Sequence, residues 1–212
     1  MPPKPKFARA QLQAAALALV DKQGLAALSM RTLAGALGTG PMTLYNYVKD
    51  RDDLDALVVE AVLAEISRPR PHGDWQHDVR AIVEATWRTV RRHPHVIPLV
   101  LTRRTLHETT LDWAEALLDA LAGSGRSGSE LLIAFRTVSG FVMGLAQAQL
   151  AGPLSAGADP DIARAQALPP ARYPRLIEIA KAATRLGADR EFRAGLDIVM
   201  TGLADPRKRT GG

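Results

Sequence analysis

Apolar residues recur at steps of three and four along most of the chain, and no segment alternates apolar and polar residues as a half-buried strand would. The first example is a stripe on one side of a helix, formed by Leu12, Ala15, Ala16, Leu19 and Val20. Because this period is that of an amphipathic helix, the sequence predicts an all-α fold.

Start and stop signals divide the N-terminal part into three predicted helices. The first runs from about 8 to 23 and ends at Gly24, because glycine readily takes the left-handed conformation that closes a helix. Ser29 is the predicted N-cap of a short second helix over 30–37. Pro41 starts the third helix, since proline in the first turn costs no hydrogen bond.

The remainder of the chain is also predicted to be helical. Asp50 caps a helix that reaches about Ile66, and the breaker SRPRPHGD follows it. Ser127 and Glu130 have the spacing of a capping box for an apolar helix ending at Leu150. The Gly-, Pro- and Ala-rich stretch 151–172 is predicted to be a mobile loop. Other helices are expected over about 75–92, 107–122, 173–185 and 189–203.

The net charge of +5 is concentrated at one end of the chain. Residues 1–51 hold seven basic and two acidic side chains, and the remainder holds twenty of each. A local basic excess attracts polyanions such as nucleic acids, although a merely solvated surface is an equal alternative. The absence of cysteine excludes disulfides and thiolate metal sites. No secretory signal is recognised at the N-terminus, and no uninterrupted apolar run approaches the length of a membrane span.

The segment 29–48 is typical of a helix-turn-helix, with Gly38-Thr39-Gly40 as its turn. If Leu44 and Val48 are buried, the side chains between them turn outward or sideways, where they can contact a DNA groove or phosphates. Tyr45 and Tyr47 could instead pack against the first helix, and we consider this alternative stronger for Tyr45.

Residues 28–49 follow the pattern L-x-x-R-x-L-A-x-x-L-G-x-x-x-x-T-L-Y-x-Y-V-K, and this pattern resembles the tetracycline repressor (TetR) family. The segments GDWQHDVRAIVEATWRTVRRHP, TVSGFVMG and EFRAGLDIVMTGL are similar to the regulatory domain of the branch that contains the tetracycline repressor itself. The resemblance covers nearly the whole chain and is firmest over 8–65.

The resemblance implies a bacterial, cytoplasmic transcriptional repressor of nine or ten helices. We expect no enzyme activity, cofactor or metal. It implies a homodimer on a palindromic operator, released by a small-molecule effector. The domains would be a helix-turn-helix domain over 1–50, a connecting helix over 51–66, a ligand-binding and dimerisation domain over 67–206, and a disordered tail over 207–212. The implied DNA contacts are Arg31, Thr39, Gly40, Pro41, Met42, Thr43, Tyr45, Tyr47 and Lys49.

The apolar helix over 130–150 has two faces on a helical wheel. The glycine-containing face, with glycines of the last helix, is the implied dimer interface: Thr137, Gly140, Gly144, Ala148, Gly195 and Gly202. Close packing inside one subunit is the alternative for these glycines. The other face contributes to an expected effector pocket, whose candidates are Thr86, Val90, His95, Trp113, Phe135, Ser139 and Val142. Plain core packing is the alternative for each of these.

Other interpretations remain open at this stage. Ile82 and Val100 align near positions where the tetracycline repressor uses polar and histidine side chains, which argues against tetracycline as the effector. His93, His95 and His107 could contact the effector or a metal, although their spacing is weak evidence for a metal site. A helical ligand-binding protein without DNA binding is one alternative function. An enzyme is less favoured because no H-E-x-x-H, G-x-S-x-G or Walker A motif is present.

Overall fold

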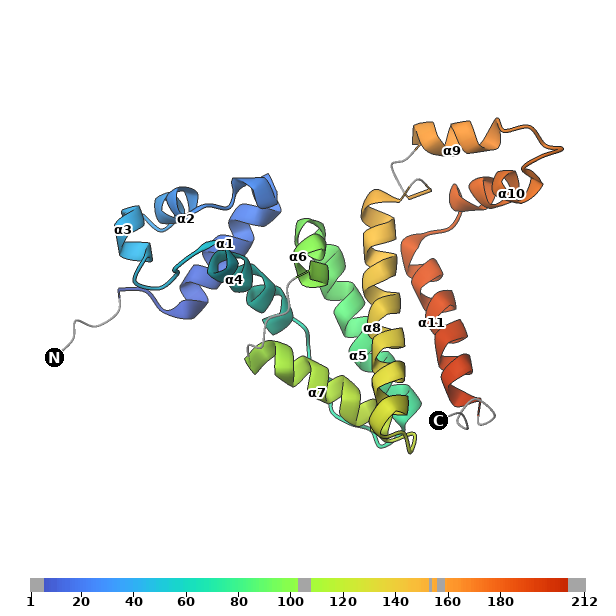
Figure 1. The fold of residues 1–212 in the computed structure, drawn as a ribbon, viewed down its shortest axis with the longest axis horizontal. Helices are drawn as coiled ribbons and strands as arrows, with labels where there is room; N and C mark the ends of the chain where they lie inside the picture. The colour runs from blue at the N-terminus through green and yellow to red at the C-terminus, as the bar shows by residue number, and fades with distance from the viewer. Residues whose placement is uncertain (1–5, 103–107, 153, 156–158, 206–212) are drawn as a thin grey trace. The chain divides into compact units, whose positions relative to one another are not determined.

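The computed structural model describes residues 6–102, 108–152, 154–155 and 159–205. Within these ranges it contains eleven α-helices, two 3₁₀ helices and no strand, which confirms the all-α prediction (Figure 1). The elements are α1 (Arg9–Gln23), η1 (Leu25–Ala27), α2 (Met30–Ala36), α3 (Pro41–Leu44), α4 (Arg51–Ala64), α5 (Trp75–Arg92), η2 (Pro94–Val96), α6 (Ile97–Thr102), α7 (Glu108–Ala122), α8 (Gly128–Ala151), α9 (Asp159–Gln166), α10 (Pro174–Ala183) and α11 (Ala188–Ala204).

The chain forms two compact units. The first is drawn from residues 1–70 and 84–119, and the second from residues 71–83 and 120–212. Helix α4, expected to be a separate connecting element, belongs to the first unit and packs along α1. These compact units do not test the domain boundaries predicted from the sequence, which stay a prediction.

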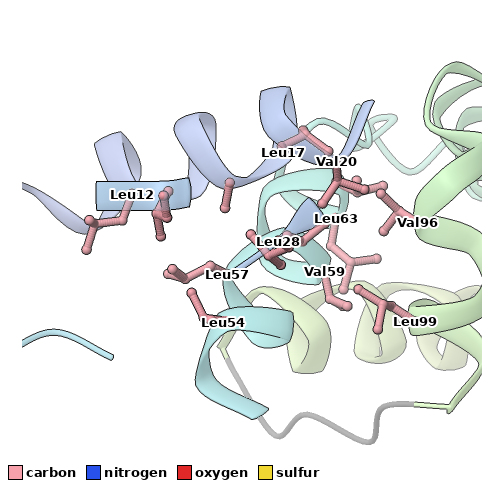
Figure 2. Packing of buried hydrophobic residues seen from close by; sticks show 14 of the residues in the cluster. Leu12, Leu17, Val20, Leu28, Leu54, Leu57, Val59, Leu63, Val96 and Leu99 are labelled. Atoms are coloured by element: carbon pink, nitrogen blue, oxygen red, sulfur yellow. The ribbon is translucent and has the colours of Figure 1, made fainter. Parts of the chain in front are cut away.

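The core of the first unit lies between α1 and α4 and extends to η2 and α6 (Figure 2). Leu12, Val20, Leu28 and Leu57 are at most 1% exposed there. Each buried leucine or valine contributes about 1.5–3 kcal/mol relative to an exposed one, so this seam holds α1 and α4 together.

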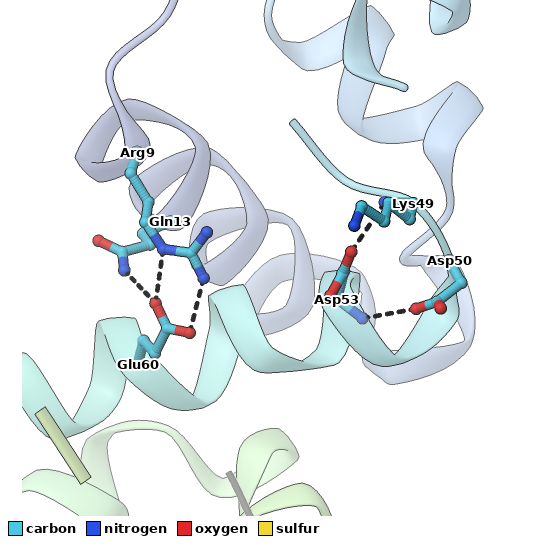
Figure 3. Close-up of polar contacts among 6 residues, drawn as sticks. All are labelled: Arg9, Gln13, Lys49, Asp50, Asp53 and Glu60. Atoms are coloured by element: carbon cyan, nitrogen blue, oxygen red, sulfur yellow. Dashed lines mark hydrogen bonds and ion pairs between the residues drawn. The ribbon is translucent and has the colours of Figure 1, made fainter. Parts of the chain in front are cut away.

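Three of the predicted helix signals are confirmed by the backbone. Gly24 has φ 78° and closes α1 with a 2.7 Å hydrogen bond from its N–H to the carbonyl of Val20. Ser29 Oγ accepts from the N–H of Thr32 at 3.2 Å, and Asp50 Oδ1 accepts from the N–H of Asp53 at 2.9 Å (Figure 3). These caps fix where α2 and α4 begin.

In the second unit, α8 packs against α11 and α9 packs against α10. Phe141 of α8 stacks on Phe192 of α11 with ring centroids 6.0 Å apart. Next to Phe192 on α11, Glu191 Oε2 accepts a hydrogen bond from Gln149 Nε2 of α8.

Two sequence predictions are wrong in this unit. The stretch 151–172 contains α9, because Ile162 is buried and Gln166 Nε2 donates to the carbonyl of Ala180 in α10 at 3.3 Å. A single apolar anchor of this kind gives no periodicity in the sequence. Ser127 is the N-cap of α8 by position, but its side chain makes no capping hydrogen bond.

Helix α8 is long and apolar enough to cross a membrane by length and composition alone, although polar residues interrupt its apolar sequence. Its only charged residues are Glu130 and Arg136. Little of its apolar window is buried within the chain, so a long apolar surface is left for another occupant.

Candidate DNA-binding surface

The helix-turn-helix segment is built by α2, a glycine-containing turn and α3. Gly38 has φ 62°, in the left-handed region that favours glycine, and the N–H of Thr39 donates to the carbonyl of Ala34 at 2.9 Å. Leu44 and Val48 are 0% and 1% exposed, as predicted, so they anchor the segment on the core. Regular helix ends at Leu44, and turns continue through Tyr47.

Large apolar side chains project from this segment into solvent. Met42 is 78% exposed and Tyr45 is 52% exposed, although burial would stabilise either side chain. The other predicted DNA contacts in solvent are Arg31, Gly40, Pro41 and Lys49, whereas Thr39 and Thr43 are half-buried. The exposed members offer cationic and apolar groups at one short segment of the chain.

Tyr47 is the exception among the predicted contacts. It is half-buried, packs against the core and meets Phe7 edge to face, with ring centroids 6.2 Å apart. Its hydroxyl accepts a 3.2 Å hydrogen bond from the N–H of Phe7. The packing alternative therefore applies to Tyr47 rather than to Tyr45, which reverses the weighting given to the two residues by the sequence.

A buried carboxylate joins α4 to α1 (Figure 3). Glu60 is 2% exposed. Its carboxylate accepts hydrogen bonds from Arg9 Nε at 2.9 Å, from Arg9 Nη2 at 2.7 Å and from Gln13 Nε2 at 2.7 Å. The hydrogen bond to Glu60 raises the pKa of Arg9 further above its usual value, so the guanidinium stays charged. This clamp therefore joins α1 to α4 by three hydrogen bonds.

Arg51 fixes the entrance to the helix-turn-helix from the other end of α4. Its guanidinium donates to the carbonyl of Leu28 at 2.7 Å and pairs with Asp55 at 2.8 Å. The N–H of Lys49 donates to Asp53 at 2.9 Å, which leaves the Lys49 ammonium in solvent (Figure 3). Because α4 is tied to α1 through Glu60 and to the residues before α2 through Arg51, a displacement of α4 would carry these segments with it.

His93 joins the C-terminal ends of α1 and α4 after the end of α5. Its Nδ1 lies 2.8 Å from Asp21 Oδ2 and its Nε2 lies 3.1 Å from Glu65 Oε2, while Arg92 also pairs with Glu65 at 2.9 Å. The ring therefore links α1 to the end of α4, and which of its nitrogens donates depends on the tautomer. The sequence reasoning did not anticipate this role, because its partners lie 72 and 28 residues away.

The candidate pocket residues fall in both units. Thr86 and Val90 are buried, Trp113 Nε1 donates to Thr86 Oγ1 at 3.0 Å, and His95 is exposed. In the second unit Val142 is buried, and the half-buried Ser139 donates to the carbonyl of Phe135 at 2.6 Å. Ile82 is buried and Val100 is half-buried, and both side chains are apolar.

No cluster of histidine and acidic residues able to hold a metal occurs among the described residues. His107 lies outside them. Inside them, His93 is occupied by carboxylates and His95 is in solvent.

The predicted dimer residues separate into two groups. Thr137, Gly140, Gly144 and Ala148 are all exposed, and a Cβ added at either glycine would meet nothing within 4 Å. Gly202 is also open. At Gly195 an added Cβ would lie 2.6 Å from Phe141 Cε2, so this glycine allows α11 to approach α8 within one protomer. The intramolecular alternative therefore holds at Gly195.

A family model described as "Tetracyclin repressor-like, C-terminal domain" matches residues 69–206. The chain is 31% identical over 214 residues to the HTH-type transcriptional repressor DrrR1 of Streptomyces coeruleorubidus, covering 95% of this chain and 78% of that one. It is 28% identical over 202 residues to the class A tetracycline repressor protein from transposon 1721 in Escherichia coli, covering 91% of this chain and 88% of that one.

Solved structures agree with the curated relatives. Apo ActR from Streptomyces coelicolor has a TM-score of 0.80 and 31% identity, over 95% of this chain and 96% of that one. ActR is a TetR family protein that has also been solved in complex with actinorhodin, with a TM-score of 0.80 and 30% identity over 93% of this chain and 95% of that one. These relatives are regulators rather than enzymes, which confirms the expectation drawn from the absent catalytic motifs. The chain belongs to the TetR family of helix-turn-helix transcriptional regulators.

Proposed function

We propose that this chain is a cytoplasmic repressor that binds a palindromic DNA operator as a homodimer and leaves it when a small-molecule effector binds. The observation that carries the DNA-binding part is the exposure of Met42 and Tyr45, at 78% and 52%, on a segment flanked by the exposed cations of Arg31 and Lys49. A thioether or an aromatic ring suits contact with a thymine methyl, and cations suit phosphates.

The proposed DNA contacts are Arg31, Thr39, Gly40, Pro41, Met42, Thr43, Tyr45 and Lys49. Pro41 and Met42 carry no strong hydrogen-bond donor, so we attribute base preference to apolar contact and DNA shape. Tyr47 enters this surface through its contact with Phe7 rather than through DNA.

The homodimer is supported by an exposed stripe on α8, which we call the α8 stripe: Ile133, Thr137, Gly140, Gly144 and Ala148. Ile133 is 65% exposed, and Ile198 on the neighbouring α11 is 75% exposed. A second copy would cover this apolar surface and bring two backbones together at the glycines. Gly202 belongs to the same proposed interface. Two-fold symmetry matches a palindromic operator.

Effector response is supported by the relatives, since ActR has been solved with actinorhodin bound. The candidate effector contacts are Thr86, Val90, His95 and Trp113 in the first unit and Phe135, Ser139 and Val142 in the second. We propose that effector binding displaces α4 and, through the Glu60 and Arg51 contacts, changes the spacing of the two helix-turn-helix segments.

Operator affinity measured with and without an effector tests this proposal. A thermal-shift screen of small molecules identifies an effector, because a ligand that binds only the folded state raises the melting temperature. We expect the effector to weaken operator binding. Equal affinity in its presence and absence would contradict effector-controlled release while leaving DNA binding intact.

Replacing Lys49 with alanine should weaken operator binding equally for all duplex sequences. The Lys49 ammonium is exposed, and the hydrogen bond that Lys49 makes to the described residues comes from its backbone N–H, so we expect a phosphate contact to be lost. The slope of log affinity against log salt should become shallower by about one unit. Fluorescence anisotropy over a salt series measures this. Lys22→Ala, at an exposed lysine in the last turn of α1, is the control, and equal slopes for both variants would exclude the contact.

A further inference from the structure

Lys6 and Phe7, which precede the N-cap of α1, contact the helix-turn-helix although they are far from it in sequence. Lys6 Nζ donates to Thr39 Oγ1 in the turn at 3.2 Å, across 33 residues. The N–H of Phe7 donates to the hydroxyl of Tyr47 at 3.2 Å, across 40 residues. The start of the described chain is therefore attached to both the turn and the residues that follow α3.

Tyr47 and Phe7 together support the Lys6 side chain. The Tyr47 ring is half-buried against the core and meets the Phe7 ring at an interplanar angle of 66°. The Lys6 ammonium lies 5.3 Å from the centroid of the Phe7 ring, within cation–π range. Tyr47, which packs against the core, is thus connected to Lys6 through Phe7.

The Lys6–Thr39 contact leaves binding capacity unused. Lys6 is exposed, and its partner in this bond is a neutral hydroxyl, so its positive charge is not compensated by that bond. A hydroxyl that accepts one hydrogen bond still has its own O–H to donate. The Lys6 ammonium and the Thr39 hydroxyl can therefore both donate a hydrogen bond to one anionic oxygen, while the ammonium also donates to the hydroxyl.

We propose that Lys6 and Thr39 form a phosphate-binding pair beside the helix-turn-helix, and that Tyr47 is a positioning residue for Lys6 rather than a base contact. This inference rests on the proposed DNA binding and adds Lys6, a residue outside the helix-turn-helix pattern, to the contact surface. It also gives the Tyr47 hydroxyl a role, since phenylalanine would keep the ring contact and lose the acceptor for the Phe7 N–H.

The test is a double-mutant cycle on the full-length chain with a DNA duplex recovered by wild-type protein from a random pool. Lys6→Gln should make the slope of log affinity against log salt shallower by about 0.9, which is the value expected when one phosphate contact to duplex DNA is lost. Tyr47→Phe should also make this slope shallower, without changing the DNA sequence that the protein prefers. The double variant should lose no more than Lys6→Gln alone, because Tyr47 acts through Lys6.

Lys22→Gln provides the matched control, since it removes the same charge from an exposed position of α1. Thermal melts check that Tyr47→Phe keeps the fold, and Lys6→Gln tests the phosphate contact independently of that variant. Equal slopes for Lys6→Gln and Lys22→Gln would show that Lys6 and Thr39 do not bind a phosphate. Additive losses, or an altered sequence preference for Tyr47→Phe, would overturn the positioning role. If wild type recovered no sequence at all, the proposed DNA binding itself would fail.

Discussion

Replacing Gly144 with arginine is expected to convert the protein from a dimer to a monomer and to weaken operator binding about 10²–10⁴-fold, the gain that joining two binding sites commonly provides. Gly144 is exposed and nothing lies within 4 Å of an added Cβ, so arginine fits an isolated protomer. A long cation in the α8 stripe would separate two helices that approach through glycine. Light scattering after size-exclusion chromatography measures the assembly, and anisotropy measures the affinity.

A smaller change at the same position gives the sharper control. In an open helical position alanine is favoured over glycine by about 1 kcal/mol, so Gly35→Ala in α2 should stabilise the protein. Gly144→Ala should instead destabilise the dimer, because a partner backbone leaves no room for the methyl group. If Gly144→Ala stabilises as much as Gly35→Ala, and Gly144→Arg remains dimeric, then the α8 stripe is not the interface.

Glu60→Ala should lower the free energy of unfolding by about 2–4 kcal/mol, reduced from the roughly 3–5 kcal/mol of a fully buried pair because Arg9 is 48% exposed. The variant removes the acceptor of three hydrogen bonds between α1 and α4. Urea unfolding followed by circular dichroism measures the change. Glu84→Ala breaks an exposed pair with Arg88 on α5 and should cost within about 0.5 kcal/mol. Equal losses for both variants would show that the clamp is not structural.

Glu60→Gln separates the charge of the clamp from its shape. The amide keeps one acceptor oxygen and nearly the same volume but removes the negative charge opposite Arg9. We expect a loss between those of Glu60→Ala and Glu84→Ala. A loss as large as that of Glu60→Ala would assign the stabilisation mainly to the ion pair.

Local signals predicted the helices near the N-terminus well, because Ser29 and Asp50 act on backbone groups three residues away and Gly24 acts on its own backbone. The buried positions Leu44 and Val48 followed from the helical period alone. These features depend on neighbours in sequence, so one chain contains enough information to place them.

Apart from the missing cap at Ser127, the errors concern side chains whose partners are far away in sequence. Tyr45 and Tyr47 are two residues apart in the same motif, and Tyr47 is held against the fold by the core and by Phe7, 40 residues away. For Glu60 a signal was available, because an acid inside the apolar run LVVEAVL must find a partner when that helix is buried. The sequence could flag this need but could not identify Arg9 and Gln13 as the partners.

The central claim is that two copies of this chain recognise one symmetric DNA site. Selection from a random duplex pool, followed by footprinting of the enriched sequence and a stoichiometric titration, tests it most directly. We predict an enriched inverted repeat, two protected half-sites on successive major grooves and a whole number of dimers per duplex, with affinity that falls as salt rises. Enrichment of no sequence, or saturation of a single unsymmetrical site by one protomer, would contradict it.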